Sequence, residues 1–328
     1  MSTANLPKSA AVILEEMKAE GRHDLAKALE GFGKAVAERE ERERTAEKTA
    51  PEKTQPSSKV IQLPLWPEDK RGTPNCFLRS ALFAAVYGNE DRKYLKNVLL
   101  AVQGDCSIHY TGEQLSQSDK DFLMAALHLA RQHPLGHVCH FRGHAFLKLL
   151  GRSDSAPNYA WLDATITRLI ATAVKIRVGK RTFEGSLLTS CKRDEGTDIY
   201  KLTFDPDFLK LYGVDDWTAI DWETHKRLGR SPLAQWIYDY AVSHVGTTIK
   251  LETLQHLSGR AEETQKIFNK AFRRAKEMLE REGGMHLNVD ENWLVTIEHP
   301  LSPSQLRHKA KKAAYFKTRR TVTRRAEV

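Results

Sequence analysis

Hydrophobic residues recur with a helical period over the stretch from Ala261 to Gly283. The spacing of about 3.6 residues places them on one face, which predicts that this face is buried. Lys266, Lys270 and Arg273 fall on another face at i, i+4 and i+7. The stretch therefore predicts an amphipathic helix with one apolar and one basic face. The apolar positions are Ile267, Phe268, Ala271, Phe272, Ala275, Met278 and Leu279.

The flanks of this helix predict its context. Lys250 to Leu257 has the pattern of a short amphipathic helix, and Ser258-Gly259 forms a turn. Met285 to Val289 and Trp293 to Ile297 are short alternating runs typical of a hairpin. Helix, turn, basic helix and hairpin is the winged form of the helix-turn-helix, whose second helix enters a major groove. The alternative is a packed helix whose basic face is only solvated.

The same order of elements is predicted in the first half of the chain. A helix from Ser118 to His133 is followed by a strand from Val138 to Phe141 and two further helices, Arg142 to Leu150 and Asn158 to Ala173. A wing hairpin is expected next and a third strand after it. The remaining expected strands are Asn97–Val102, Ser107–Thr111, Val174–Val178, Thr182–Leu188 and Ile199–Phe204.

These patterns predict an α+β chain with two tandem winged-helix domains. In the second half, Ser231 is a good N-cap and Pro232 suits the first position of another helix. The expected parts are a polar, partly helical or disordered extension (1–57), a linker (58–73), a first domain (74–213), a second domain (214–303) and a basic tail (304–328).

Composition narrows the class of partner. The chain has 328 residues, enough for two domains with tails, and a formal net charge of +9 that fits a polyanionic partner. Its four cysteines are scattered without a CxxC pair, which favours reduced thiols in the cytoplasm. No apolar run approaches the length of a membrane span. We therefore expect a cytoplasmic protein without a membrane segment.

A short apolar island interrupts the polar N-terminal region. Residues 62–66, Gln-Leu-Pro-Leu-Trp, resemble the QLxLF peptide that bacterial proteins insert into the sliding clamp of DNA polymerase. An isolated hydrophobic patch in a polar segment is typical of docking peptides. The alternative is that the peptide packs on the first domain of its own chain. The expected clamp-binding residues are Gln62, Leu63, Leu65 and Trp66.

Candidate DNA contacts follow from the two expected groove-binding helices. Lysines and arginines neutralise phosphates, and a few groups near the start of each helix contact bases. The candidates in the second domain are Gln265, Lys266, Asn269, Lys270, Arg273 and Arg274. Those in the first are Asn158, Tyr159 and Arg168 on the helix and Lys175, Lys180 and Arg181 on the expected wing. Asp163 is expected to be a solvated acid or to accept a hydrogen bond from a base.

Catalytic and metal-binding signatures are weak. Four histidines and Cys139 crowd into the stretch from His133 to His144, but they lack the paired spacing of a zinc site. The sequence contains no GxxxxGK[ST] loop, HExxH or GxSxG motif. We expect no enzyme activity, cofactor or metal.

Several blocks resemble the TrfA-type plasmid replication initiators. They are residues 63–83, 108–115, 169–174 and 226–236, and the similarity runs over roughly residues 60 to 298. The resemblance implies tandem winged-helix domains that bind direct repeats (iterons) as monomers at a plasmid origin, with dimers that limit copy number. It also implies opening of adjacent AT-rich DNA, which is then contacted in single-stranded form. The implied host partners are the replicative helicase, the host initiator and the sliding clamp.

Two other functions remain open at this point. A transcriptional repressor of the same fold would bind a single operator, and a strand-nicking initiator enzyme would form a covalent adduct with DNA.

Overall fold

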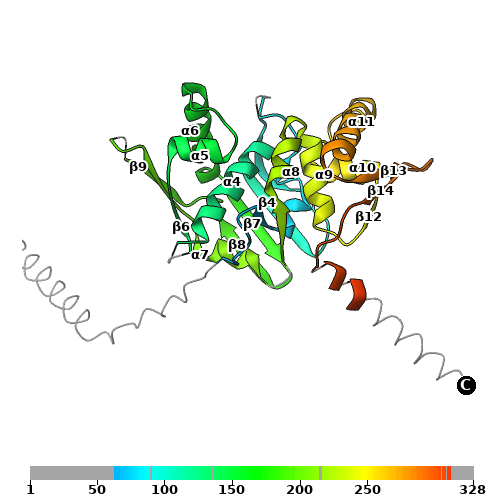
Figure 1. The fold of residues 1–328 in the computed structure, drawn as a ribbon, viewed down its shortest axis with the longest axis horizontal. Helices are drawn as coiled ribbons and strands as arrows, with labels where there is room; N and C mark the ends of the chain where they lie inside the picture. Colours follow the sequence, from blue (N-terminus) through cyan, green and yellow to red (C-terminus); the bar gives the residue numbers. More distant parts are fainter. Residues whose placement is uncertain are drawn as a thin grey trace, which may run out of the picture. The chain divides into compact units, whose positions relative to one another are not determined.

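The computed structural model describes residues 63–88, 91–133, 136–194, 196–213, 216–303, 305–307 and 309–311 (Figure 1). These residues belong to one compact unit that spans Val60–Val328. The predicted extension (1–57), Gln62 and most of the predicted basic tail lie outside the described residues. Helices and mainly antiparallel sheets alternate along the unit, so the expected mixture of helix and sheet is confirmed.

One three-stranded sheet and three helices form a module in the first half of the unit, here called the N-module. Its sheet has the strand order β6-β10-β9, so the last strand lies between the other two. Its elements are α4 (Gln117–Ala130), β6 (Val138–Arg142), α5 (Gly143–Leu149), α6 (Ala156–Ile170), β9 (Ser190–Asp194) and β10 (Ile199–Thr203).

A second module, here called the C-module, repeats this topology. Its sheet has the order β12-β14-β13, which again places the last strand in the middle. Its elements are α9 (Pro232–Val242), β12 (Thr247–Lys250), α10 (Leu251–Leu257), α11 (Gln265–Glu282), β13 (His286–Val289) and β14 (Leu294–Glu298). The two halves therefore repeat one topology of helix, strand, two helices and hairpin, in which β12 was not predicted and the hairpin of the first half is not the predicted one.

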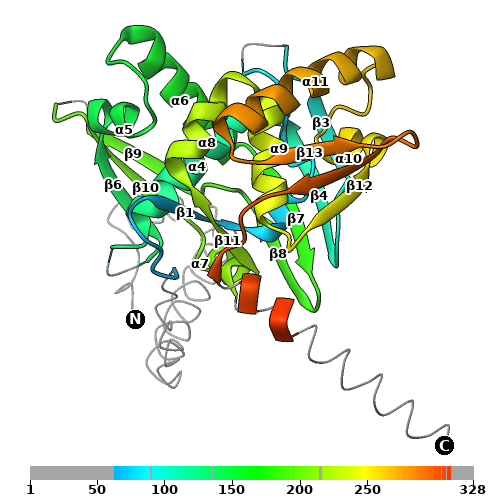
Figure 2. The same cartoon turned by 45° about the vertical axis from the view of Figure 1, so that its right-hand side comes forward.

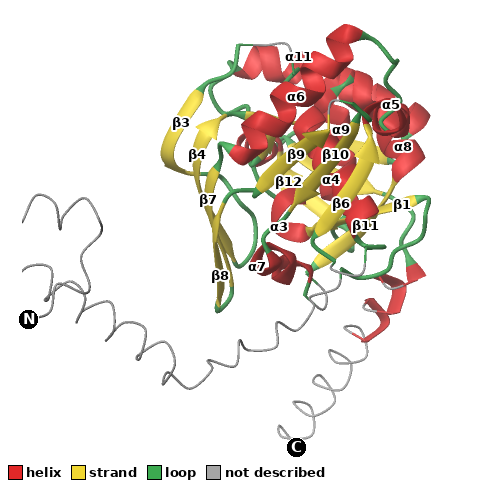
Figure 3. Cartoon of the chain, turned by 90° about the vertical axis from the view of Figure 1, so that its left-hand side faces the viewer, coloured by secondary structure: helices red, strands yellow, loops and turns green. Residues whose placement is uncertain are grey.

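The predicted wing of the first half was wrong. Strands β7 (Ala173–Val178) and β8 (Arg181–Gly185) form a hairpin, but it belongs to a separate four-stranded sheet of order β3-β4-β7-β8 (Figure 3). The hairpin of the N-module is β9–β10, and β9 was not predicted. Its sequence, Ser-Cys-Lys-Arg-Asp, lies at a sheet edge and is mostly exposed, so it has no hydrophobic alternation to detect.

The other elements connect the modules. β3 (Tyr94–Leu99) pairs with β4 (Cys106–Glu113), which confirms the predicted strand pair near the start of the unit. β1 (Lys70–Pro74) pairs with β11 (Trp217–Asp221), so a segment before the N-module and one after it share a ladder. The remaining short elements are α3 (Asn75–Leu78), β2 (Phe83–Ala84), β5 (Leu115–Ser116), α7 (Pro206–Leu209), α8 (Trp222–Arg227) and two 3₁₀ turns, Lys210–Tyr212 and Leu228–Arg230.

Each module has its own hydrophobic cluster. In the N-module, Phe122 packs against Phe146, which stacks on Phe141. In the C-module, Phe268 and Phe272 of α11 join Trp236 of α9. Helix α4 contributes to both clusters, since most of its apolar residues belong to the first and Met124 belongs to the second. The two modules are therefore joined through a shared helix.

The segment from residue 63 to 69, here called the strap, is part of the first core. The Trp66 side chain is only 3% exposed, stacks on Tyr212 and donates from Nε1 to His128 Nδ1 at 2.9 Å. Leu63 is buried as well, whereas Leu65 is 76% exposed. The interpretation of this peptide as an isolated apolar island was therefore wrong, because two of its three described anchor residues pack on their own chain.

Polar contacts hold the strap against α4 and Arg131. Burial and the neighbouring cations Arg71 and Arg131 lower the pKa of His128 to about 4, so the ring is neutral near pH 7. Because Nδ1 accepts from Trp66, the proton resides on Nε2 and is donated to Glu68 at 3.0 Å. Arg131 holds the other Glu68 oxygen at 2.6 Å. A sliding clamp that binds Leu63 and Trp66 must first withdraw them from this site.

We expect Trp66→Ala to lower the free energy of unfolding by about 3–5 kcal/mol, because it leaves a large cavity in the core. Leu65→Ala is the matched control, and its effect should stay within about 0.5 kcal/mol because the side chain is exposed. Urea unfolding of both variants measures the difference. Equal stability of the two variants would show that the strap does not contribute to the core.

Candidate nucleic-acid interface

Helix α11 begins later than its hydrophobic pattern predicts. Arg260 bonds both carboxylate oxygens of Glu263 at 2.7 and 2.8 Å, and Gln255 Nε2 donates to the backbone carbonyls of both residues. These contacts fix the preceding residues as a turn, so the helix starts at Gln265 instead of Ala261. The α10–turn–α11 unit is thereby held rigid at the point where α11 becomes exposed.

One face of α11 is buried and the opposite face is basic. The side chains of Phe268, Phe272, Ala275 and Leu279 face the core, as predicted. Ile267 was expected there too, but it is 56% exposed beside the basic residues. Among the described residues, none forms an ion pair with Lys266, Lys270, Arg273 or Arg274, which are all exposed. These four cations are available to a polyanion.

The first turn of α11 presents two amides. Gln265 Nε2 donates to Asn269 Oδ1 at 2.7 Å on the exposed surface. The remaining donors and acceptors of this pair are free to contact base edges, because side-chain amides match the hydrogen-bonding groups of adenine in the major groove. The structure therefore brings together all six residues predicted in the C-module, Gln265, Lys266, Asn269, Lys270, Arg273 and Arg274, on one exposed helix.

At the corresponding start of α6 in the N-module, the candidate side chains form hydrogen bonds within their own chain. Asn158 Nδ2 donates to the Ser153 carbonyl at 2.8 Å and to Ser155 Oγ at 3.1 Å, so this amide holds the turn before the helix. Tyr159 bonds Asp198 in the β9–β10 connection at 3.4 Å. Burial, Asp154 and Asp198 raise the pKa of Tyr159 to about 12. Neither side chain is placed as a free base-contacting group.

Arg168, the predicted basic residue of α6, is also occupied. It bonds Glu113 at 2.9 Å and the buried carboxylate of Asp119 at 2.7 Å. Asp119 in turn accepts from Arg92 at 2.7 Å and from the Ser116 backbone N–H at 2.8 Å, which forms the capping box of α4. In this structure the charge of Arg168 stabilises the packing of α6 on α4, and its predicted contact with DNA stays a prediction.

The three predicted wing cations lie elsewhere. Lys175, Lys180 and Arg181 belong to the β7–β8 hairpin of the four-stranded sheet, which lies away from α11 (Figure 2). Lys175 pairs with Glu184 at 3.0 Å, and Arg181 pairs with Asp216 and bonds the Lys210 carbonyl at 3.0 Å. Their assignment to a wing is therefore corrected.

The hairpin that does follow α6 is tied to the helix. Asp163 accepts from Tyr200 at 3.1 Å and from Arg193 at 3.3 Å, and Arg193 also approaches Asp198 at 3.8 Å. The Asp163 side chain is 48% exposed, so it is a partly solvated acid that also has two partners in its own chain. These partners lie 30 and 37 residues away in the chain, so no local sequence signal indicates them.

The histidine-rich stretch around β6 carries no metal arrangement in the part of the chain that the structure describes. No three His, Cys, Asp or Glu side chains there are placed to share an ion. The ring centroids of His133 and His140 lie 5.4 Å apart.

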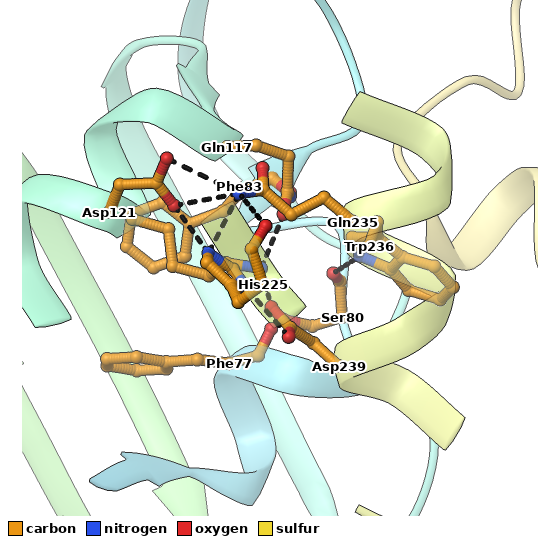
Figure 4. A network of polar contacts seen from close by, with 10 residues as sticks. Phe77, Ser80, Phe83, Gln117, Asp121, His225, Gln235, Trp236 and Asp239 are labelled. Carbon is orange, nitrogen blue, oxygen red and sulfur yellow. Dashed lines mark hydrogen bonds and ion pairs between the residues drawn. The ribbon is translucent and has the colours of Figure 1, made fainter. Parts of the chain in front are cut away.

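A buried polar network sets the relation between the two modules (Figure 4). Lys120 of α4 binds Asp239 of α9 at 2.5 Å, and both side chains are about 1% exposed. His225 of α8 is fully buried between Asp239 at 2.9 Å and Asp121 of α4 at 2.6 Å. Gln235 of α9 donates to Asp121 at 3.3 Å. We call this set of five residues the interlock.

The interlock keeps His225 charged. Burial by itself lowers the pKa of this imidazole, but the carboxylates of Asp239 and Asp121 outweigh that effect and raise its pKa to about 9. Both ring nitrogens therefore donate to a carboxylate near pH 7. Burial likewise opposes ionisation of Asp239, and His225 and Lys120 more than compensate, which lowers its pKa. Two buried cations thus surround one buried anion.

The family model "TrfA protein" matches residues 33–297. The chain belongs to the TrfA family. The sequence blocks that resemble TrfA-type initiators therefore indicated the correct family.

Individual relatives agree with this assignment. The plasmid replication initiator protein TrfA of Escherichia coli is 31% identical over 219 residues, which are 63% of this chain and 57% of that protein. The chain thus spans little more than half of this curated relative. A crystal structure of domains 2 and 3 of RctB aligns with a TM-score of 0.51 at 16% identity, covering 70% of this chain and 99% of that one. This likeness concerns the fold alone. A structure of the Pi initiator protein in complex with iteron DNA aligns with a TM-score of 0.41 at 12% identity, covering 56% of this chain and 94% of that one.

Among the helices that the structure of this TrfA-family chain describes, none combines the length and apolar character needed to cross a bilayer.

We expect the stability of the unit to fall as pH rises from about 6.5 to 9. The folded pKa of His225, about 9, exceeds its ordinary value of 6.5, so the stabilisation is complete below pH 6.5 and is lost as pH rises through 9. The loss should be about 3 kcal/mol in urea unfolding. His225→Gln is the control, because it cannot titrate. If the wild type and this variant change in parallel across the window, the imidazolium contributes nothing.

Proposed function

We propose that this TrfA-family chain is a plasmid replication initiator that binds direct repeats in origin DNA. The observation that supports the proposal most strongly is the unpaired basic face of α11, presented by a rigid helix–turn–helix with a hairpin beside it. Family membership supports the same function.

In this proposal both modules are winged helices. Helix α11 lies in the major groove, where Lys266, Lys270 and Arg273 neutralise phosphates and release counterions. Gln265 and Asn269 contact base edges from the first turn, with adenine as the preferred partner. Ile267, exposed at the same end of the helix, offers an apolar contact to a thymine methyl group.

Helix α6 acts differently in this proposal. Its exposed positions include Ala160, Ala164 and Thr167, and its arginine, Arg168, is bound to carboxylates. A helix with this surface fits a groove by shape and apolar contact and adds little charge. The N-module therefore orients the protein on DNA, while the C-module provides most of the salt-dependent affinity.

Origin opening and recruitment of host proteins complete the proposal. Without a nucleotide-binding loop in the sequence, the free energy for melting AT-rich DNA comes from binding and from deformation of the duplex. The opened strand, the replicative helicase, the host initiator and a second copy of the chain are the further partners. Docking to the sliding clamp requires the strap to leave the first core, since Leu63 and Trp66 are buried there.

Footprinting across the DNA that flanks the gene, at several salt concentrations, tests the function. We expect a ladder of protected, evenly spaced direct repeats next to an AT-rich segment that becomes reactive to permanganate. A single protected inverted repeat over a promoter, with no melting, would instead support a repressor. A covalent protein–DNA adduct would support a nicking enzyme.

The contrast between the two helices gives a second test. Lys270→Ala should weaken binding to any DNA sequence and reduce the slope of log K against log salt by about 1, with stability unchanged. Arg168→Ala should lower the free energy of unfolding by about 3 kcal/mol, because it removes a cation from the buried Asp119. Its salt slope, measured by fluorescence anisotropy under folded conditions, should equal that of the wild type. A reduced slope for Arg168→Ala would place this residue on DNA after all.

A further inference from the structure

A polar groove separates the two helices that would lie in the major groove. Its main cavity has a volume of about 650 Å³ and is lined by Trp161 of α6, Arg281 of α11 and the connection between α8 and α9. A smaller hollow of about 340 Å³ adjoins it and shares Arg152 and Trp161. Helices α6 and α11 lie on the same side of the unit in Figures 1 to 3, so a ligand across both helices also covers this groove.

Arg152 is the central cation of the groove. Its guanidinium lies 3.6 Å from the centroid of the Trp161 ring, and one nitrogen donates to Asn158 at 3.3 Å. The side chain is partly buried, yet no described carboxylate forms an ion pair with it. Stacking on an aromatic ring fixes the plane of a guanidinium and leaves its edge available to a second partner.

The second unpaired cation is Arg230, on the opposite wall. It is exposed at the end of the 3₁₀ turn Leu228–Arg230 and makes no ion pair with the described residues. Arg230 belongs to the connection that enters α9, whereas Arg152 follows α5. The two arginines therefore reach the groove from different modules.

The acids of the groove are already neutralised by other groups. Asp121 binds His225 in the interlock at 2.6 Å. Glu223 binds Lys226 at 2.8 Å, and Glu282 binds Arg281 at 3.0 Å. Because each of these carboxylates pairs with another cation, neither Arg152 nor Arg230 has an ion-pair partner among the described residues, although Asp121 and Asp119 lie near enough to attract the charge of Arg152. The groove therefore fits an anion that spans the two modules.

We infer that this groove binds the DNA backbone between two successive major-groove contacts, with Arg152 and Arg230 holding phosphates. The inference rests on the proposed function and deepens it. When two helices enter neighbouring major grooves on one side of a duplex, the backbones that border the intervening minor groove face the protein between them. Phosphate contacts of this kind fix register without reading sequence.

The interlock fixes the floor of the groove between the two arginines. Asp121 and Gln235 line its floor and belong to the buried network that joins α4, α8 and α9. Separating α4 from α8 and α9 would therefore break buried charge pairs. Arg152, held on the Trp161 ring, loses little conformational freedom on binding, whereas the exposed Arg230 side chain orders when it meets a phosphate.

Arg152→Gln and Arg230→Gln test this inference on the full chain. Each should weaken binding to a double-stranded repeat by about tenfold and reduce the salt slope by about 1, equally for the repeat and for a scrambled duplex. Arg177→Gln is the matched control, since Arg177 is exposed on β7 of the four-stranded sheet and loses the same charge. It should leave both quantities unchanged.

Ethylation interference locates the phosphates. With the wild type, ethylation of the phosphates between the two half-sites should interfere with binding. In each groove variant, ethylation of the one phosphate that the replaced arginine contacts should no longer interfere. Arg230→Gln keeps the test independent of folding, because the side chain is exposed and makes no ion pair or side-chain hydrogen bond with the described residues. Wild-type affinity, slope and interference pattern in both variants would overturn the inference while repeat binding, and so the proposed function, stands. Failure of the wild type to bind any repeat would overturn both.

Discussion

The pairing of buried charges between α4, α8 and α9 is the constraint on which the arrangement of this protein depends. Moving Lys120, Asp239 and His225 out of water is costly, and only their mutual contacts recover that cost. Removing one partner of such a set leaves an uncompensated charge, typically at about 3–5 kcal/mol. An apolar interface of the same size tolerates sliding, whereas this one is satisfied only when all three helices are in register. The interlock therefore fixes the orientation of α4, α8 and α9 relative to one another.

The two modules share a topology and differ in how they use their charges. In the N-module, Arg168 and Arg193 are bound to carboxylates of α4 and α6. In the C-module, the four cations on the exposed face of α11, Lys266, Lys270, Arg273 and Arg274, form no ion pair among the described residues. The contrast follows from the surroundings of each helix. Arg168 of α6 lies within reach of Asp119 on α4 and Glu113 on β4, whereas no described carboxylate pairs with Lys270 or Arg273 on the exposed face of α11.

Sequence patterns predicted the features that depend on neighbouring residues, such as helices and their buried faces. The period of Phe268, Phe272 and Leu279 predicted the buried face of α11, and the neighbouring runs predicted α10 and the β13–β14 hairpin, whereas β12 was not predicted. The patterns did not predict what depends on distant partners. Arg168 lies 49 residues from Asp119, and Trp66 lies 62 residues from His128, so neither contact has a local signature. The polar edge strand β9 was missed for a related reason, since only its pairing with β10 makes it a strand.

A division of charge between the modules has a consequence for selectivity if the chain binds origin DNA as proposed. Cations increase affinity for every DNA sequence equally, so two strongly basic helices would raise non-specific binding as much as specific binding. A helix such as α6, whose arginine is bound to its own chain, adds contacts that depend on the shape of the groove and not on salt. The rigid interlock then makes the second contact conditional on the first, because α6 reaches its groove only when α11 is in the correct register. In such an arrangement the ratio of specific to non-specific binding is determined by geometry, and the unpaired charges of α11 and of the groove determine only the overall strength.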